Sequence, residues 1–135
     1  MRPAPLLDTH AWIWWVRHDP RVSSHLVEQL DKFAAHERPY VADVSLWEVA
    51  MLVDKGRLDL PRPVTEWLTD AAHPRTVRVV PISPAIAGET HAARALRDPA
   101  DRLIVATSRV LDAPLFTYDR TILRSRLCPR WNPNG

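Results

Sequence analysis

Apolar residues along the chain form two kinds of pattern, and the two kinds alternate. Short apolar runs such as Leu6-Leu7 are typical of buried strands. Longer stretches with apolar residues at helical spacing, such as the one through Trp12, Trp15 and Val16, are typical of amphipathic helices. The pattern predicts strands at residues 5–7, 39–42, 76–82 and 115–118. It predicts helices at residues 9–16, 24–38, 45–55, 64–72, 84–96 and 99–112.

Turn-forming residues separate these elements. Pro20 ends the first helix and Gly56 follows the third. Ser83-Pro84 and Asp98-Pro99 each match a helix start, with a capping side chain followed by proline in the first turn. Strands that alternate with helices form parallel sheets through right-handed crossovers. The sequence therefore predicts one α/β domain with three layers, whose central parallel sheet has four or five strands, with residues 76–82 as a buried strand.

The composition is that of a single globular domain. The chain has 135 residues, of which 25% are charged and 46% hydrophobic, and this balance excludes disorder, coiled coil and collagen. The apolar stretch at residues 11–16 is too short for a signal peptide or a membrane span, so we expect a cytoplasmic protein. Cys128 is the only cysteine, which excludes an internal disulfide and leaves no ligand set for structural zinc.

The charge is mildly basic. A formal net charge of +2 and a pI of about 9.1 permit nucleic-acid binding without requiring it. Of the 18 basic residues, only Lys32 and Lys55 are lysines. Arginine favours planar, bidentate contacts with phosphate, but a GC-rich coding bias explains this usage equally well.

Acidic residues follow the first and fourth predicted strands. Asp8 and Asp119 would converge if these strands are neighbours, because ligands bind outside the carboxyl ends of parallel strands at a topological switch point. Glu48 and Asp101 lie in the first turns of two helices that begin or end near the same edge. Such oxygen ligands without His or Cys suit Mg²⁺ or Mn²⁺, which serve phosphodiester hydrolysis. We expect nearby helix N-termini to favour the ionised carboxylates.

Each acid also has a structural explanation. Asp8 and Asp98 can each cap the helix that follows, Asp119 can cap a turn at Arg120, and Ser45 to Glu48 matches a capping box. Taken singly, these explanations are the stronger ones. The recurrence of acids at comparable places in successive strand-helix units favours a shared site.

Four segments together are similar to the PIN domain, and specifically to VapC-type toxins. They are residues 6–10 (LLDTH), 45–49 (SLWEV), 98–107 (DPADRLIVAT) and 117–119 (TYD). The DPADR block is the most specific of them, and the order and spacing of all four strengthen the resemblance. The resemblance implies a Mg²⁺-dependent endoribonuclease that forms a homodimer and is neutralised by a cognate VapB-like antitoxin.

The resemblance also implies roles for individual residues. Asp8 and Asp101 would be the main Mg²⁺ ligands, and Glu48 a ligand or a water-positioning group. Asp119 would be a second-site or water-mediated ligand, and Thr117 would support the cluster by hydrogen bonding. For Asp98 we place helix capping ahead of metal binding.

Residues around the acids are candidates for binding RNA or a partner. The cations nearest in sequence, each of which could equally be an ordinary surface residue, are Arg17, Arg94, Arg97, Arg102 and Arg120. Arg102 could instead pair with a neighbouring acid or an antitoxin group. Trp12 and Trp15 are predicted core residues. Trp14 could line a groove for an antitoxin helix or stack on an RNA base, and we favour the antitoxin groove. Trp47 is expected to pack the helix predicted at residues 45–55 against the sheet.

Other functions fit the sequence less well. A phosphatase with Asp8 as nucleophile would need a second acid where His10 stands. A receiver-like phospho-acceptor would need a lysine after a late strand, and a catalytically silent binding module would not need every acidic position filled. The sequence has no G-x-S-x-G motif and no glycine-rich phosphate loop.

Overall fold

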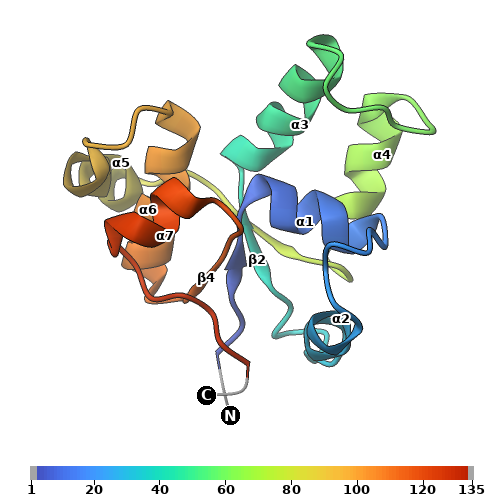
Figure 1. The fold of residues 1–135 in the computed structure, drawn as a ribbon, viewed down its shortest axis with the longest axis horizontal. Coiled ribbons are helices and arrows are strands. Elements are labelled where there is room, and N and C mark those ends of the chain that lie inside the picture. The colour runs from blue at the N-terminus through green and yellow to red at the C-terminus, as the bar shows by residue number, and fades with distance from the viewer. Residues whose placement is uncertain (1–2, 134–135) are drawn as a thin grey trace.

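A computed structural model describes residues 3–133 as a central parallel sheet between two layers of helices (Figure 1). Its strands are β1 (Leu6–Leu7), β2 (Tyr40–Ala42), β3 (Arg78–Val80) and β4 (Leu115–Phe116), in the order β3-β2-β1-β4. A single bridge between Leu115 and Arg130 continues the sheet beyond β4. The predicted three-layer α/β architecture is confirmed.

The strand order places a switch point between β1 and β4. The chain runs from β1 to β2 and β3 on one side, then returns to place β4 on the other side of β1. Leu6 pairs with Leu115 and Leu7 with Phe116, and the Asp8 amide donates to the Phe116 carbonyl at 3.1 Å. The carboxyl ends of the first and fourth strands are therefore neighbours, as the sequence required for its two acids to meet.

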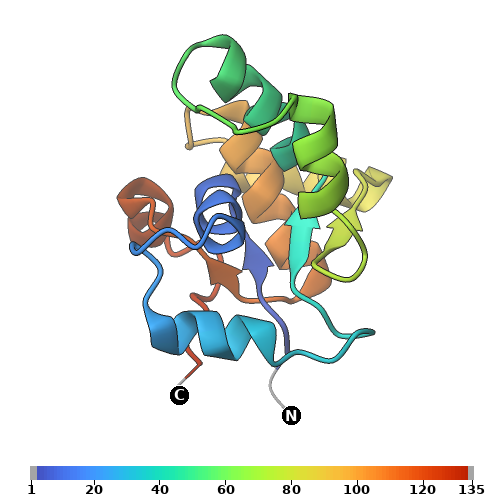
Figure 2. The same cartoon turned by 90° about the vertical axis from the view of Figure 1, so that its right-hand side faces the viewer.

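Alternating side chains of the strands separate two apolar clusters. Leu7, Val41 and Phe116 face one layer, which contains α1 (Thr9–Val16), α2 (Ser24–Asp31) and α4 (Val64–Ala71). Leu6 and Leu115 face the other layer, which contains α5 (Pro84–Glu89), the 3₁₀ helix η1 (Thr90–Ala93), α6 (Pro99–Leu111) and α7 (Arg120–Ser125). Figures 1 and 2 show the two layers, with α3 (Val44–Asp54) rising beyond the carboxyl ends of the strands.

Two of the tryptophans in α1 belong to the core, as predicted. Trp12 is fully buried and its indole N–H donates to the Ala71 carbonyl at 3.0 Å. Trp15 is also buried and donates to an Asp31 carboxylate oxygen at 3.0 Å. The prediction for Trp47 is wrong, because its side chain is 60% exposed. Its neighbours Glu48 and Val49 point inward, and helical geometry then turns Trp47 outward.

Three predicted elements differ from those observed. The helix predicted to residue 38 ends at Asp31, and the buried Arg38 donates to the Asp31, Phe33 and Thr76 carbonyls, which holds the chain in a turn instead. The helix predicted over 84–96 becomes 3₁₀ from Thr90. The third strand is half-exposed, because the sheet order puts β3 at an edge.

No helix within residues 3–133 combines the length and the apolar character that crossing a bilayer requires.

Candidate acidic site at the carboxyl end of the sheet

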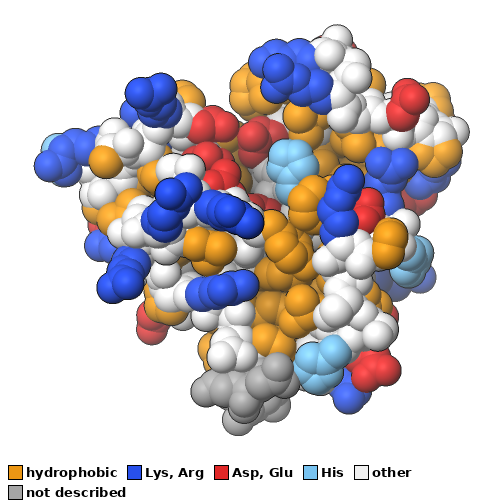
Figure 3. All heavy atoms as spheres, in the orientation of Figure 1, with side chains coloured by type: hydrophobic (Ala, Val, Ile, Leu, Met, Phe, Trp, Pro, Cys, Tyr) orange, Lys and Arg blue, Asp and Glu red, His pale blue; other side chains and the backbone are white. Residues whose placement is uncertain are grey.

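Five carboxylates line one hollow of about 330 Å³ at the switch point. They are the side chains of Asp8, Glu48, Asp98, Asp101 and Asp119. The hollow is visible in Figure 3 as a recess with clustered acidic side chains. All the acidic residues singled out from the sequence therefore meet, although they come from four separate parts of the chain.

Thr117 joins the acids that follow the two neighbouring strands. Its hydroxyl donates to Oδ2 of Asp8 and accepts from the backbone N–H of Asp119 at 3.0 Å. The other oxygen of Asp8 accepts from the Ala11 amide at 2.8 Å, so Asp8 also caps α1. Asp119 caps α7 through the amides of Thr121 and Ile122. Asp8 and Asp119 therefore each cap a helix and also belong to the acidic cluster.

Glu48 is held by a buried hydroxyl pair rather than by its own helix start. The Thr9 hydroxyl lies within hydrogen-bond reach of Glu48 Oε1 and 2.9 Å from the Ser45 hydroxyl. The predicted capping box is therefore wrong. Because α3 begins two residues earlier than that box requires, with Asp43 as the residue before it, Ser45 lies inside the helix and Glu48 points across to α1.

The beginning of α6 supplies the remaining two carboxylates. Asp98 Oδ1 accepts from the Ala100 amide at 2.9 Å, so it caps α6 as expected. Asp98 also lines the hollow beside Asp101, which lies in the first turn of α6. The position of Asp98 is therefore consistent with helix capping and also with metal binding.

The acids repel one another and are partly removed from water. Burial is the main cause that raises the pKa of Asp101 to about 7, and the charges of Asp98, Asp119, Glu48 and Asp8 raise it further. Burial also raises the pKa of Asp8 and of Glu48, against hydrogen bonds from Thr117 and Thr9 respectively that lower it. The Ala11 amide at the start of α1 lowers the pKa of Asp8, as expected of a helix N-terminus, but burial outweighs it, and burial is also the main cause of the raised pKa of Glu48 and Asp101.

These shifts predict how the stability of the metal-free protein depends on pH. In the folded chain Asp101 holds its proton up to about pH 7, whereas the unfolded chain loses it near the ordinary value of 3.8. Stability from this group is present at low pH and is lost as the pH rises through the folded pKa. We expect the unfolding temperature to fall between about pH 4 and about pH 7, measured by circular dichroism in EDTA. A rise over that interval would contradict the assignment.

The donor set fits a hard divalent cation by its chemistry. All five groups offer carboxylate oxygens, the ligands that Mg²⁺ and Mn²⁺ prefer. A cation would also relieve the mutual repulsion that raises the pKa of Asp101. Within residues 3–133, no three side chains of the Asp, Glu, His and Cys types are already gathered around one point as a metal site. If three or more of these carboxylates are to bind one cation, their side chains must therefore rotate within the hollow.

The arginines predicted from the sequence lie in different surroundings. Arg17 and Arg97 are exposed, as is Arg120 at the start of α7. Arg94 is exposed and donates to the His91 carbonyl. Arg102 is half-buried and its Nε donates to the Leu96 carbonyl at 2.5 Å, which gives it a structural role.

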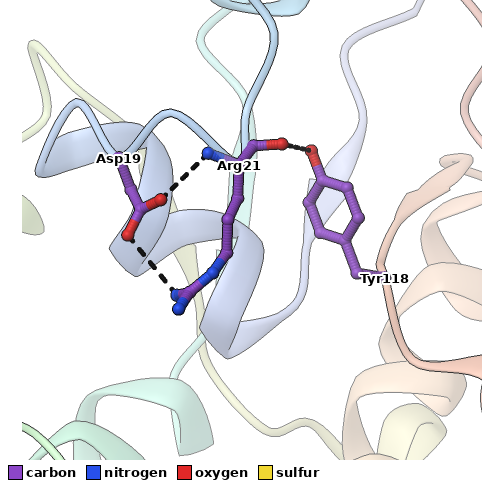
Figure 4. A network of polar contacts seen from close by, with 3 residues as sticks. All are labelled: Asp19, Arg21 and Tyr118. Atoms are coloured by element: carbon purple, nitrogen blue, oxygen red, sulfur yellow. Dashed lines mark hydrogen bonds and ion pairs between the residues drawn. The ribbon is translucent and has the colours of Figure 1, made fainter.

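Aromatic side chains form one wall of the hollow. Trp14 lies between the rings of His10 and Tyr118, at centroid distances of 5.6 and 5.2 Å, and the guanidinium of Arg21 lies 4.6 Å from its centroid. Figure 4 shows how Arg21 is held, by the carboxylate of Asp19 and by the Tyr118 hydroxyl, which donates to the Arg21 carbonyl at 3.3 Å. The loop after α1 is thereby tied to the residue that precedes Asp119.

Sequence reasoning missed several residues of this site. Thr9, Tyr118 and Arg21 were not singled out, although Thr9 and Tyr118 stand directly beside predicted acids. The position of Thr9 directly after Asp8, at the carboxyl end of the first predicted strand, is the sequence signal that could identify it. No pattern in the sequence indicated that Arg21 would lie over Trp14, because that contact depends on the path of a loop.

Comparisons with known proteins agree with this fold. The PIN domain family matches residues 6–126. Ribonuclease VapC22 of Mycobacterium tuberculosis (strain ATCC 25618 / H37Rv) is 38% identical over 130 residues, which cover 93% of each chain. The crystal structure of FitAcB from Neisseria gonorrhoeae has a TM-score of 0.67 at 21% identity and covers 96% of this chain and 98% of that one.

A structure of FitAB bound to an IR36 DNA fragment has a TM-score of 0.61 at 19% identity and covers 96% of this chain and 95% of that one. At this identity, the two solved structures establish the shared fold alone. The family match spans all four strands and both helical layers, and the relative at 38% identity extends over 93% of the chain. The resemblance found in the sequence is therefore confirmed, and the chain belongs to the PIN domain family.

Proposed function

We propose that this protein is a metal-dependent endoribonuclease, the toxin of a toxin-antitoxin pair. The observation that carries the proposal is the convergence of five carboxylates in one hollow at the switch point of the sheet. The similarity to a protein named Ribonuclease VapC22 supports RNA as the substrate. A cluster of repelling carboxylates is unsuited to bind a polyanion by itself, and a bound cation would remove that conflict.

In this proposal, Asp8 and Asp101 are the main ligands of Mg²⁺ or Mn²⁺, with Glu48 as a ligand or water-positioning group. Asp119 holds a second ion or a bound water, and Asp98 remains a cap that adds negative charge. A divalent cation supplies charge neutralisation at the phosphate and lowers the pKa of water. The side chains of the chain contribute position and charge around that chemistry.

The hydrogen bonds of the site define what each side chain contributes. Thr117 fixes the Asp8 carboxylate by donating to it, and Thr9 fixes Glu48 in the same way. Asp101 makes no such bond among the described residues, so its orientation is free to adjust to a cation.

Cleavage of total RNA by the antitoxin-free protein tests the proposal. The reaction is run with Mg²⁺, with Mn²⁺ and with EDTA, and the Asp101→Asn variant, purified in parallel, controls for contaminating nucleases. Discrete metal-dependent products that are absent with the variant are expected. Products that persist in EDTA, or that the variant makes equally well, would refute a metal-dependent acidic site. No cleavage of any RNA would favour a silent binding module.

Trp14 is proposed to contact the antitoxin as well as to wall the hollow. Its ring is half-buried between His10, Tyr118 and Arg21, at a position where a partner segment could cover both the ring and the acids. We expect Trp14→Ala to weaken antitoxin binding, measured by calorimetry, more than it slows cleavage by the free toxin. An equal or greater loss of cleavage would assign Trp14 to RNA binding instead.

The homodimer also remains a proposal. The large apolar side chains that the fold leaves most exposed include Trp47, at 60%, and Ile82, at 49%. If they form the dimer contact, Trp47→Ser should shift the mass measured by light scattering from dimer to monomer. An unchanged dimer mass would place the contact elsewhere.

A further inference from the structure

The segment from α7 to the end of the sheet carries positive charge that no carboxylate neutralises. Its four arginines, here called the arginine surface, are Arg120, Arg124, Arg126 and Arg130. All four are exposed, and none forms an ion pair with a carboxylate among the described residues. The only acid in residues 119–131 is Asp119, which belongs to the acidic hollow. Figure 3 shows blue side chains gathered over α7, beside the red recess.

A second cavity lies within the arginine surface. It measures about 520 Å³ and is walled by Leu123 and Leu127, with Cys128 half-buried in its lining and Arg126 and Arg130 at its polar side. Pockets of about 300–1,000 Å³ that combine apolar walls with a few polar groups are typical ligand sites. The cavity therefore offers an apolar recess next to uncommitted guanidinium groups.

The cavity and the acidic hollow lie on either side of one short stretch of backbone. Thr117 lines the cavity, and its hydroxyl donates to Asp8, while Tyr118 and Asp119 line the hollow. A single-stranded polyanion lying over residues 117–119 would have the acidic hollow at one end and the arginine surface at the other. A polyanion repelled by the acids would be attracted on the other side.

We propose that the arginine surface binds the RNA strand on one side of the bond that is cut, with its guanidinium groups on the phosphates and the cavity receiving a base. This proposal rests on the proposed nuclease function. Single-stranded RNA is recognised by such a combination of a cationic path along the backbone and recesses for unstacked bases. Arginine's planar fork suits phosphate oxygens.

Binding is measured by fluorescence anisotropy of a labelled random single-stranded RNA, in EDTA and in an Asp101→Asn background, over a series of salt concentrations. The test variants are Arg126→Gln/Arg130→Gln and Arg120→Gln/Arg124→Gln. The matched control, Arg62→Gln/Arg75→Gln, makes the same change in net charge around α4, in the opposite helical layer (Figure 1). Thermal melting verifies that each variant is folded.

Each test variant is expected to weaken RNA binding by roughly tenfold and to reduce the slope of log K against log salt by about 1.4, because each phosphate contact on a single strand contributes about 0.7. The control should leave affinity and slope close to those of the background protein. Equal losses in the control, unchanged binding in both test variants, or no RNA binding at all would overturn the proposal.

The single cysteine gives an independent measurement that needs no arginine substitution. Cys128 lines the cavity, so saturating RNA should slow its modification by a methanethiosulfonate reagent severalfold. An unchanged rate with RNA bound would overturn the proposal, as would protection by polyglutamate but not by RNA, which would assign the surface to an acidic protein segment. Because binding is measured without metal, a failure of cleavage refutes the nuclease proposal separately.

Discussion

Replacing Asp101 by asparagine is expected to reduce metal-dependent RNA cleavage at least about a hundredfold. This is more than is usually lost when a residue that only orients a metal ligand is replaced. Asp101 is the carboxyl group on which the charges of Asp98, Asp119, Glu48 and Asp8 all act. It therefore lies where a cation bound among the acids would be most strongly attracted. The measurement is the initial rate of cleavage of a defined RNA in Mg²⁺, with enzyme in excess.

The same substitution should leave the fold intact and raise its stability at high pH. Asparagine is close to aspartate in shape but removes a desolvated charge that its neighbours repel. The unfolding temperature of Asp101→Asn should match that of the natural chain below about pH 4, where Asp101 is protonated in both the folded and the unfolded chain, and should exceed it increasingly up to about pH 7. The fall in stability between these pH values should also become smaller.

Asp112→Asn is the matched control for Asp101→Asn. Asp112 is an exposed acid at the other end of α6, and its backbone lies in the left-handed region that asparagine tolerates well. This variant should cut RNA at the natural rate and keep the natural pH dependence of stability. Cleavage by Asp101→Asn at the natural rate would show that the acidic hollow is not the catalytic site.

Replacing Thr117 by valine is expected to lower cleavage by about tenfold to a hundredfold, the range typical of groups that orient metal ligands. The hydroxyl donates to Asp8 and accepts from the Asp119 amide, and valine can do neither. The carboxylate of Asp8 would then rotate more freely. The effect should appear mainly as a lower cleavage rate at saturating Mg²⁺ and as a higher Mg²⁺ concentration for half-maximal cleavage.

Replacing Thr117 by valine should also lower the free energy of unfolding by about 1–3 kcal/mol, because the buried Asp8 carboxylate and the Asp119 amide lose their hydrogen-bond partner. Thr117→Ser keeps the hydroxyl and should restore most of the activity. Thr107→Val provides the control, since the Thr107 hydroxyl is buried but bonds only to the Leu103 carbonyl within α6. If Thr117→Val and Thr107→Val have the same cleavage rates and Mg²⁺ requirements, Thr117 has no positioning role.

The layered fold was predictable because its information is local. Runs such as Leu6-Leu7 and the helical spacing of Trp12 and Trp15 are set by neighbouring residues, and alternation of strands and helices restricts the topology to a parallel sheet. The predictions failed where a contact between distant segments decided the outcome. Arg38, for example, ends the second helix early through carbonyls that include one from Thr76.

The candidate site was predictable to the same extent. Because side chains at the carboxyl ends of neighbouring parallel strands face one crevice, the positions of Asp8 and Asp119 after their strands sufficed to bring them together once β1 and β4 were paired. The orientation of Glu48 was not predictable, since its bond to Thr9 depends on how α3 packs against α1. The arginine surface depended likewise on the path of the chain after α7.

The sequence by itself determined the four strands, most of the helices, the three-layer class and the identity of the acids, because hydrophobic periodicity and turn residues act over a few neighbouring positions. It did not indicate α7. Only the tertiary structure decided which hydroxyls hold those acids, how far burial raises their pKa values, and which arginines remain without carboxylate partners. Desolvation and charge interaction depend on distances between segments far apart in the chain, and those distances exist only in the folded protein.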